Sequence, residues 1–600
     1  MKRFFSNILT AFIGTFLALF ALIFVLIGKF SAEVKTTPVA PNSFLKLNFN
    51  SPIPELTGNV NNNISLNDLT ALTKKNIGLH EYIKAIDQAA SDKNIKGIYL
   101  ELDNHANGLA TSKQLRNAIL KFKESGKFVY AYANYYSKSG YYLATVADSV
   151  FVHPLGGVDF LGFSAIITFF KGSLDKLGVK AMPFYAGKFK SATEPFRMEQ
   201  MSAENRTQTR EYIEGMFSLY LNTISEGRNI DIATLRNIAD NALADNATAA
   251  LNLKLVDALK YKDEVIELLH NKTGISQKEK LNPISLDQYI ERTKTLQPTT
   301  NSKNTIAIVY AEGNIVDGEG SLGSIGGDKY ARIIREIRQK DNVKAIVLRI
   351  NSGGGSSLAS DIIWREIEKA KEQGIKIVTS MGNYAASGGY YIASNSDYIF
   401  AEENTLTGSI GVFGLLFNMN DLYKNKLGMT MDTVKTTSLS TLDAANYYGV
   451  NEREAALIQK SVDEVYEVFK KRVSDGRKMS MEAVEEIAQG RVWLGVKAKE
   501  IGLVDSLAGL QSAIAYAAQL ANIDSYKTSN YPVIKDMSEE ILNLFNGVDD
   551  HKKPEMNLPR VNVSDIFVRF PELHKMINTL EDIQQLEGVQ TRLPFSIEIQ

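Results

Sequence analysis

One serine of this sequence stands where it could act as a nucleophile. Ser387 lies in the stretch MGNYAASGGYYIAS, residues 381–394, and small residues flank it on both sides. Small neighbours allow a strand to turn sharply into a helix and leave a serine hydroxyl exposed, as in a nucleophile elbow. Here Ala385 stands where that motif has its first glycine. The same pattern is also typical of a tight turn that has no catalytic role.

A glycine-rich loop could supply the second part of such a site. In RINSGGGSSLAS, residues 349–360, three glycines follow an apolar run and precede a helical pattern. Glycines allow backbone N–H groups to converge on one point, and the oxyanion of an acyl-transfer reaction needs such donors. The loop matches neither the Walker phosphate-binding pattern nor the dinucleotide-binding fingerprint. A tight turn between strand and helix is the other interpretation.

The proton acceptor for Ser387 is not evident from its neighbours. The six histidines are His80, His105, His153, His270, His551 and His574, and none lies between residues 305 and 530. A Ser–His–Asp triad would need a histidine from outside that range. Those considered are His105, His153, His551 and His574. A lysine is the other known partner, provided that burial lowers its pKa from about 10.4 toward roughly 7–8. Composition does not choose among the lysines.

The composition excludes several classes of function. The chain has no cysteine, which excludes disulfides, thiolate nucleophiles and cysteine-ligated zinc. No two histidines have the spacing of a helical metal pair, so we expect neither a bound metal nor another cofactor. The net charge is −1 without a basic stripe, which gives no reason to expect a nucleic-acid partner.

The N-terminal residues predict a membrane anchor over residues 1–30. Lys2 and Arg3 precede an uncharged run, NILTAFIGTFLALFALIFVLIG, from Asn7 to Gly28. At 1.5 Å per residue such a helix spans a bilayer core of about 30 Å. The run exceeds the usual apolar region of a cleaved signal peptide, and no clear A-x-A site follows it. Because Lys2 and Arg3 should stay cytoplasmic, we expect the body of the protein on the far side of the membrane.

An internal duplication organises the rest of the chain. NIKGIYLELDN at Asn94 matches NVKAIVLRINS at Asn342, and four further pairs of segments match at the same offset of 248–250 residues. We therefore predict two copies of one domain, over residues 45–300 and 305–530. The linker QPTTNSKNT, residues 297–305, separates them. The polar segment 531–600 matches neither copy, and we expect an extension there with local structure only.

Both copies alternate between strand and helix patterns. In the second copy, residues 344–350 and 375–381 read as buried strands on either side of a helix over 358–374, and a further strand lies within DYIFAEENT. This alternation predicts an α/β fold with a mostly parallel sheet. Residues 203–228 and 452–477 read as long, charged amphipathic helices.

The duplication acts as an internal control for the candidate site. At the position of Ser387 the first copy has Lys138, and in place of the three glycines it has His105, Ala106 and Asn107. If these features only supported folding, both copies would keep them. The difference predicts a site in the second copy and a degenerate first copy. The paired tyrosines that follow occur in both copies, so we expect them to serve packing. These are Tyr141, Tyr142, Tyr390 and Tyr391.

These motifs resemble the signal peptide peptidase A family, in its long membrane-anchored form with two tandem repeats. NYAASGGYYIAS is similar to the serine motif of that family, which maps its nucleophile to Ser387. GKFKSATEPF, residues 187–196, is similar to the lysine motif, which maps the general base to Lys190. TLTGSIGVFG, residues 405–414, is similar to a further segment, in which Ser409 would help to orient the lysine.

The resemblance implies a serine peptidase with a Ser/Lys dyad and an acyl-enzyme intermediate. Backbone N–H groups near the serine would hold the oxyanion, and the residues implied are Gly354, Gly355 and Gly388. The oxyanion loop of the family usually reads Ser-Pro-Gly-Gly. This chain has Gly353 in place of the proline and keeps both of the following glycines.

The implied lysine also fits its local sequence. Lys190 follows an apolar run and precedes Ser191 and Thr193, whose hydroxyls could hydrogen-bond an amine. The corresponding place in the second copy, around Leu439 and Ser440, has no lysine. Each copy would then supply half of a dyad, the base from the first and the nucleophile from the second.

The resemblance further implies the architecture and the surroundings of the protein. It implies two tandem ClpP/crotonase-like repeats after one transmembrane helix, and self-assembly into a homo-oligomeric ring or dome, expected to be a tetramer. The protein would be a single-pass protein of the inner membrane with its catalytic body on the periplasmic side. The expected substrates are apolar peptides such as remnant signal peptides.

Three other functions are compatible with parts of the pattern. A crotonase-like acyl-CoA enzyme would share the oxyanion loop, but it usually employs a carboxylate instead of a nucleophilic serine. An esterase of the α/β-hydrolase type would need His551 or His574 from the C-terminal segment. A membrane-anchored scaffold would need no chemistry at all.

Overall fold

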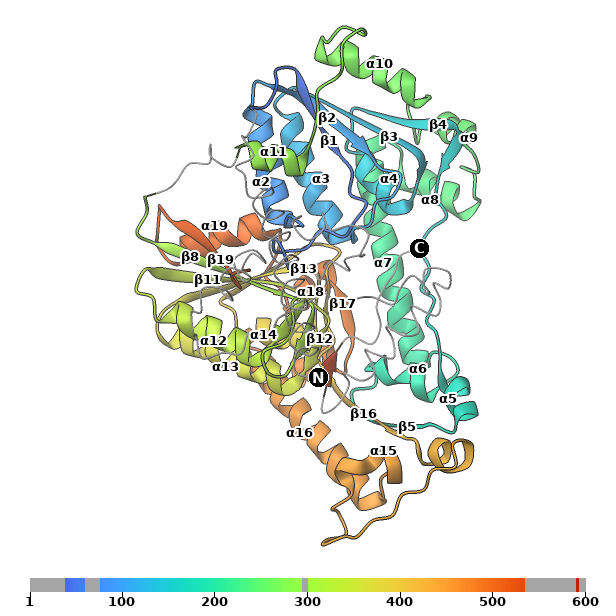
Figure 1. Cartoon of the computed structure of the whole chain (residues 1–600), viewed down its shortest axis with the longest axis vertical. Helices are drawn as coiled ribbons and strands as arrows, with labels where there is room; N and C mark the ends of the chain where they lie inside the picture. The colour runs from blue at the N-terminus through green and yellow to red at the C-terminus, as the bar shows by residue number, and fades with distance from the viewer. Residues whose placement is uncertain (1–37, 60–75, 294–300, 535–589, 593–600) are drawn as a thin grey trace, which may run out of the picture.

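The computed structural model describes residues 38–59, 76–293, 301–534 and 590–592. The membrane segment expected within residues 1–30, as well as His551 and His574, lies outside these residues. Within the described residues, no helix combines the length and the apolar character needed to cross a bilayer. Figure 1 shows two α/β units, the earlier one in blue to green above the later one in yellow-green to red.

The first unit is built on a parallel sheet with the strand order β6-β4-β3-β2-β1-β7. Its strands are β1 (Ser43–Leu47), β2 (Ile95–Glu101), β3 (Phe128–Tyr136), β4 (Ser149–Val158), β6 (Ala258–Leu259) and β7 (Pro283–Ser285). Its helices are α2 (Leu79–Ser91), α3 (Leu109–Lys123), α4 (Lys138–Ala144), α8 (Ile232–Asp240), α9 (Ala247–Asn252), α10 (Lys262–Thr273) and α11 (Leu286–Thr293). The strands read as near-continuous apolar runs because helices cover the sheet.

The second unit repeats this plan around a sheet with the order β17-β15-β13-β11-β8-β19, in which only β17 is antiparallel to its neighbour. Its strands are β8 (Thr305–Glu312), β11 (Val343–Ser352), β13 (Lys376–Ala386), β14 (Tyr398–Ala401), β15 (Leu406–Gly408), β17 (Val492–Leu494), β18 (Ser506–Leu507) and β19 (Lys527–Tyr531). Its helices include α12 (Gly327–Arg338), α13 (Ser357–Glu372), α14 (Gly388–Ala393), α17 (Met481–Ile487), α18 (Gly495–Glu500) and α19 (Leu510–Leu520). The strands and the helix expected between residues 344 and 401 are confirmed.

Both long helices predicted from charge and periodicity are present with the expected bounds. They are α7 (Ala203–Arg228) and α16 (Glu452–Arg477). The side chain of Ser202 accepts a hydrogen bond at the start of α7, and Asn451 forms a capping box with Glu454 at the start of α16. Each helix ends at a residue in the left-handed conformation.

A third sheet combines strands from both units, and the sequence did not predict it. Its order is β10-β9-β12-β20-β16-β5. The strands are β5 (Lys180–Ala186), β9 (Asn314–Val316), β10 (Ser324–Gly326), β12 (Gly354–Ser356), β16 (Val412–Asn418) and β20 (Gln590–Arg592). Antiparallel pairing of β5 with β16 extends from Lys180 opposite Asn418 to Ala186 opposite Val412. This sheet therefore ties the segment before the lysine motif to the second unit.

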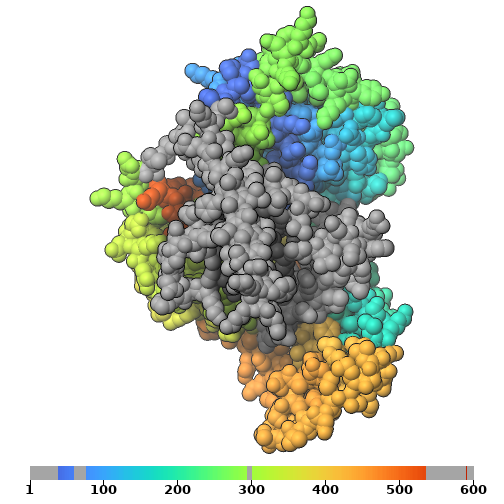
Figure 2. Space-filling model, viewed as in Figure 1, coloured from blue at the N-terminus to red at the C-terminus, as the bar shows by residue number. Residues whose placement is uncertain are grey.

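The outer end of this sheet carries short elements from both units. They are α5 (Lys171–Leu177), the 3-10 turn η2 (Ser191–Thr193), α6 (Glu194–Arg197), η4 (Leu422–Lys426), η5 (Leu442–Ala444) and α15 (Ala445–Tyr448). The N–H of Leu422 donates to the carbonyl of Gly178, which joins the two segments. Figure 2 shows them in teal and orange at one end of the molecule.

The segment after Tyr531 does not have local structure only, and that expectation is wrong for residues 590–592. These residues form β20, which lies between β12 and β16 although both of those strands are far from it in the sequence. A strand of this length has no hydrophobic periodicity to detect, and its stability comes from main-chain hydrogen bonds to both neighbours. The pattern of its own residues therefore gave no signal of its partners.

Candidate active site

The structure brings Ser387 and Lys190 into contact across 197 positions of the sequence. Lys190 Nζ lies 2.8 Å from Ser387 Oγ, within hydrogen-bond distance. Both side chains are buried, with exposed fractions of 1% for Lys190 and 0% for Ser387. The predicted nucleophile and the implied base are therefore direct neighbours in a buried site.

Ser387 occupies a sharp turn between β13 and α14, as the small residues around it predicted. Its backbone has φ 55° and ψ −119°, a conformation that residues with a Cβ rarely adopt. Its N–H donates to the carbonyl of Gly408 at 2.8 Å. A Cβ at Gly389 would lie 2.6 Å from the carbonyl oxygen of Ser352, so a glycine is needed where the helix approaches the end of β11. The turn holds the serine hydroxyl toward the lysine.

Lys190 directly follows the loop that leaves β5, and the second unit holds this loop in place. The N–H of Phe189 donates to the carbonyl of Gln489 at 2.8 Å. A Cβ on Gly490 would lie 2.6 Å from Lys190 Cβ, so only a glycine permits this approach. Burial lowers the pKa of Lys190 well below its ordinary value of 10.5, which favours the neutral amine that a general base requires.

Ser409 is a second contact of the amine. Lys190 Nζ lies 3.1 Å from Ser409 Oγ and 3.4 Å from the carbonyl oxygen of the same residue. The ring of Phe413 lies 5.9 Å from Nζ and forms an apolar wall. The two hydroxyls expected near the amine have other partners: Ser191 accepts from Gln208, and Thr193 accepts from Arg197.

The glycine loop lies beside the serine, with different roles for its members. The N–H of Gly354 donates to Ser352 Oγ at 3.1 Å, and that hydroxyl donates to the carbonyl of Gly313. Gly355 pairs with Ile315, and a Cβ there would lie 1.9 Å from the carbonyl oxygen of Ile315. Gly388 opens α14, where the first N–H of a helix has no partner within the helix. This N–H adjoins the nucleophile.

The two histidines of the first unit that were considered as bases, and Lys138, all contact other residues of that unit. His105 Nε2 lies 2.7 Å from Ser112 Oγ, and burial lowers the pKa of this imidazole to about 4. His153 contacts the ring of Tyr261 edge-on. Lys138, at the position equivalent to the serine, forms an ion pair of 2.6 Å with Asp159.

The remaining expectations about the repeats concern packing. The hydroxyls of Tyr141 and Tyr390 donate to the carbonyls of Leu255 and Leu503, which are equivalent places in the two units. All four paired tyrosines are buried, so their packing role is confirmed. The turn that follows Lys190 recurs in the second unit as η5, so the residue equivalent to Lys190 is Thr441, just beyond the expected Leu439 and Ser440.

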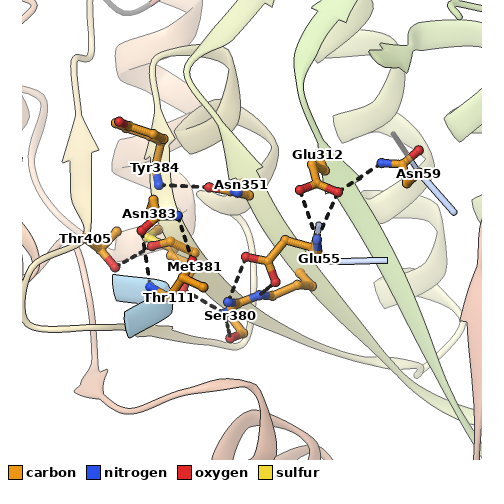
Figure 3. Close-up of polar contacts among 12 residues, drawn as sticks. Glu55, Asn59, Thr111, Glu312, Asn351, Ser380, Met381, Asn383, Tyr384 and Thr405 are labelled. Carbon is orange, nitrogen blue, oxygen red and sulfur yellow. Dashed lines mark hydrogen bonds and ion pairs between the residues drawn. The ribbon is translucent and has the colours of Figure 1, made fainter. Parts of the chain in front are cut away.

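A buried polar network holds the strands of the site against the first unit, and Figure 3 shows its residues. Arg349 on β11 donates to Ser380 Oγ and to the carbonyl of Met381 on β13. The same guanidinium forms a buried ion pair of 2.8 Å with Glu55. The N–H of Glu55 donates to the carboxylate of Glu312.

A second contact in Figure 3 links α3 to the strand that ends at the nucleophile. Asn383 Oδ1 accepts from the N–H groups of Ala110 and Thr111 at 3.2 Å, and its Nδ2 donates to Thr111 Oγ1. The N-cap residue of α3 is Gly108, which has no side chain to do this. Asn383 therefore caps a helix of the first unit from the second.

Sequence reasoning missed Gln489, Gly490, Asn383 and the Glu55–Arg349 pair. A charged residue within the apolar strand pattern before the glycine loop was a signal for Arg349, because buried charges need partners. The others gave no signal, since their roles depend on contacts between the two units.

Comparison with known proteins gives one family. A model described as Peptidase family S49 matches the chain twice, over residues 121–276 and 369–524. "Protease 4" of Salmonella typhi is 38% identical over 76% of this chain and 75% of its own length. "Protease 4" of Haemophilus influenzae is 36% identical over 84% of each chain. "Serine protease SPPA, chloroplastic" of Arabidopsis thaliana is 32% identical over 77% of this chain and 68% of its own.

Proposed function

The chain belongs to peptidase family S49 and is a serine peptidase, and from this premise we propose that Ser387 and Lys190 form its catalytic dyad. The observation that carries the proposal is the 2.8 Å separation between Lys190 Nζ and Ser387 Oγ in a buried site. A lysine can activate a serine only when its amine is neutral, and burial favours that state.

In the proposed reaction, the neutral amine of Lys190 takes the proton of Ser387 as Oγ attacks the peptide carbonyl. The N–H of Gly388, with donors from the loop of Gly354 and Gly355, would stabilise the oxyanion of the tetrahedral intermediate. For this, the N–H of Gly354 would exchange its bond to Ser352 Oγ for one to the oxyanion. Lys190 then gives its proton to the leaving amine, and an acyl-enzyme remains on Ser387. Water, activated by the same amine, releases the acyl group. Ser409 orients Nζ through these steps.

The dyad draws one residue from each unit, which explains why the chain keeps two copies. Lys190 comes from the first unit, and the pairing of β5 with β16 places its loop beside the serine. In each unit the place of the missing group has another residue, Lys138 in the first and Thr441 in the second. Loss of either unit would therefore remove half of the chemistry.

We further propose that the substrates are apolar peptides such as remnant signal peptides. The ring of Phe413 on β16 supports this, since it lies 5.9 Å from Lys190 Nζ and gives the site an apolar wall. A transmembrane helix within residues 1–30 would keep the peptidase at the inner membrane, with its body on the periplasmic side. The resemblance of the sequence motifs supports two ClpP/crotonase-like repeats.

A homo-oligomer, expected to be a tetramer, is part of the same proposal. The end of the molecule formed by residues 420–450 exposes several apolar side chains. They are Leu427, Met429, Met431 and Val434. Exposed apolar groups gathered on one segment are typical of an interaction surface. The solution mass of the protein would test the subunit number.

Hydrolysis of an apolar peptide reporter tests the dyad. We expect Ser387→Ala and Lys190→Ala to lower kcat by roughly 10²–10⁴-fold or more, because each removes a reacting group. The matched control is Lys188→Ala, since Lys188 is exposed two residues before the base. A serine-directed acylating probe should label the wild type and the control but not Ser387→Ala. Near-normal turnover by either dyad variant would refute the proposal.

A further inference from the structure

One buried side chain of α7 contacts the residues on both sides of the base. Gln208 has an exposed fraction of 1%. Its amide Nε2 donates to the carbonyl of Phe189 at 3.0 Å and to Ser191 Oγ at 3.1 Å. Since these two residues flank Lys190 in the sequence, the amide holds the loop immediately before and immediately after the base.

The same amide reaches the strand pair of the second unit that leads to Ser409. Gln208 Oε1 accepts from the N–H of Val492 at 3.4 Å, and Figure 1 shows α7 beside β17. β17 begins at Val492 and pairs with β15, which ends directly before Ser409. The carbonyl of Arg491 accepts from the N–H of Ser409 at 2.7 Å. Gln208 therefore joins the loop of the base to the strands that carry the second contact of its amine.

The first turns of α7 hold Gln208 in this place. The buried carboxylate of Glu194 accepts from Ser202 Oγ at 2.6 Å and from Asn205 Nδ2 at 2.8 Å. Asn205 Oδ1 in turn lies 3.3 Å from Gln208 Nε2. Each polar group of this cluster bonds to another, which fixes the direction of the glutamine side chain.

Burial, and not a nearby charge, is what lowers the pKa of Lys190. Glu194 bonds to the start of α7, and Glu211 forms an ion pair with Arg491. The charged residues of the loop and of the elements packed against it are Lys188, Glu194, Arg197, Glu211 and Arg491. A shift of the loop that admits water to the amine would therefore raise its pKa toward the ordinary value.

We propose that Gln208 is a positioning residue of the peptidase, whose amide holds the amine of Lys190 against Ser387. This inference rests on the proposed function, because it takes Lys190 as the general base. The amide supplies two donors and an acceptor, so one side chain can bond the loop and β17 together. Precise placement matters, since a displacement of about 1 Å can cost roughly 10²-fold in rate.

Two substitutions in the full chain test this role. Gln208→Leu removes all bonds of the amide, and Gln208→Glu keeps the acceptor for Val492 but loses the donors. For a peptide reporter we expect kcat to fall about tenfold or more in both variants. KM should change by less than about twofold, because the amide bonds to groups of the protein itself. If Gln208→Leu does not fold, Gln208→Glu has the wild-type shape and makes the test alone.

The matched control is Gln459→Leu. Gln459 lies on the other long helix, α16, and donates to the carbonyl of Tyr185 on β5 at 3.3 Å. It therefore also joins a helix to the main chain of the first unit, but it does not contact the residues beside Lys190. We expect its kcat to change by less than about twofold.

The pH–rate profile separates positioning from a general loss of stability. We expect the apparent pKa of the rising limb of kcat/KM to increase by about 0.5 or more in Gln208→Leu, because water reaches the amine. The increase should be larger in Gln208→Glu, whose carboxylate favours the ammonium form. A lower kcat with an unchanged apparent pKa would mean a structural role only and would overturn the inference. An unchanged kcat would overturn it as well.

Lys190→Ala distinguishes a failure of this inference from a failure of the dyad. If Lys190→Ala is inactive while both Gln208 variants match the wild type, the dyad stands and only the positioning role is wrong. If Lys190→Ala is active, the proposed dyad itself is wrong, and the role of Gln208 is lost with it.

Discussion

At the residue scale, Lys190 must be neutral to serve as a base. Burial lowers its pKa well below 10.5. The amine therefore becomes fully neutral at a lower pH than the amine of an ordinary lysine. We expect kcat/KM to rise with pH and to level off at an apparent pKa below that ordinary value. A pH–rate profile of reporter hydrolysis measures this.

Lys190→Arg is the control for that profile. A guanidinium stays protonated over the whole range, so the variant should be inactive at every pH although it keeps a long cationic side chain. An activity that still climbs steeply near pH 10, or an active arginine variant, would contradict the role of a neutral amine.

The strained backbone of Ser387 leads to a second prediction. Its backbone has φ 55° and ψ −119°. This conformation costs a residue with a Cβ about 1–3 kcal/mol, whereas glycine adopts it freely. Ser387→Gly should therefore be more stable than Ser387→Ala by about 1 kcal/mol, although both variants lack activity. Denaturant unfolding of the two variants makes the comparison. Equal stabilities would mean that the turn relaxes when the hydroxyl is removed.

Sequence patterns located the nucleophile but not the base. Ser387 stood out because small residues and the contrast with Lys138 marked the turn. Lys190 depended on a family resemblance, since its burial results from the pairing of β5 with β16 and from the close approach of Gly490. Periodicity along one segment carries no information about a partner from another domain.

At the scale of elements, Asn383 couples helix α3 to the strand that ends at the nucleophile. Its side-chain oxygen caps α3, and loss of an N-cap costs about 1 kcal/mol. We expect Asn383→Ala to destabilise the protein by this amount and to lower kcat, because Asn383 lies on β13, four residues before Ser387. Thermal unfolding and reporter hydrolysis measure the two effects.

Asn383→Asp is the matched comparison for this cap. A carboxylate keeps the acceptor and favours the positive end of the helix dipole, so this variant should retain more stability than Asn383→Ala. If both substitutions have the same effect, the cap is not the source of the coupling.

Elements were predictable wherever one segment contains its own signal. Helices α7 and α16 and strands β11 and β13 follow from periodicity and apolar runs. The sheet that contains β5, β12, β16 and β20 does not, because its strands are short and come from distant parts of the chain. That sheet is what brings the loop of Lys190, which follows β5, to the second unit.

At the scale of the whole molecule, the constant offset of the repeats predicted two units, but their interface could not be predicted. The interface contains the ion pair of Arg349 with Glu55 and a pocket of about 220 Å³ lined by residues of both units. His80 and Glu402 contribute buried polar atoms to the lining. Patterns of single segments do not show which buried charges will face one another.

Glu402 makes the stability of this interface depend on pH. Burial raises its pKa from 4.5 to about 7, while Arg349 and Lys113 oppose the shift and Glu403 and Glu55 add to it. Between these two pH values the folded protein keeps a proton that the unfolded chain releases. Stability therefore falls as pH rises from about 4.5 to about 7 and levels off above, by on the order of 3 kcal/mol for this residue.

Glu402→Gln isolates this contribution, since an amide of the same shape cannot ionise. Glu312, whose pKa burial also raises to about 7, and Lys190 are present in both proteins, so their pH dependence cancels in the comparison. We expect Glu402→Gln to gain stability relative to the wild type on going from pH 5 to pH 8, whatever the amide itself costs at the lower pH. Denaturant unfolding of both proteins at the two pH values gives the difference. A difference in stability that does not change with pH would show that Glu402 titrates normally and that the interface tolerates its charge.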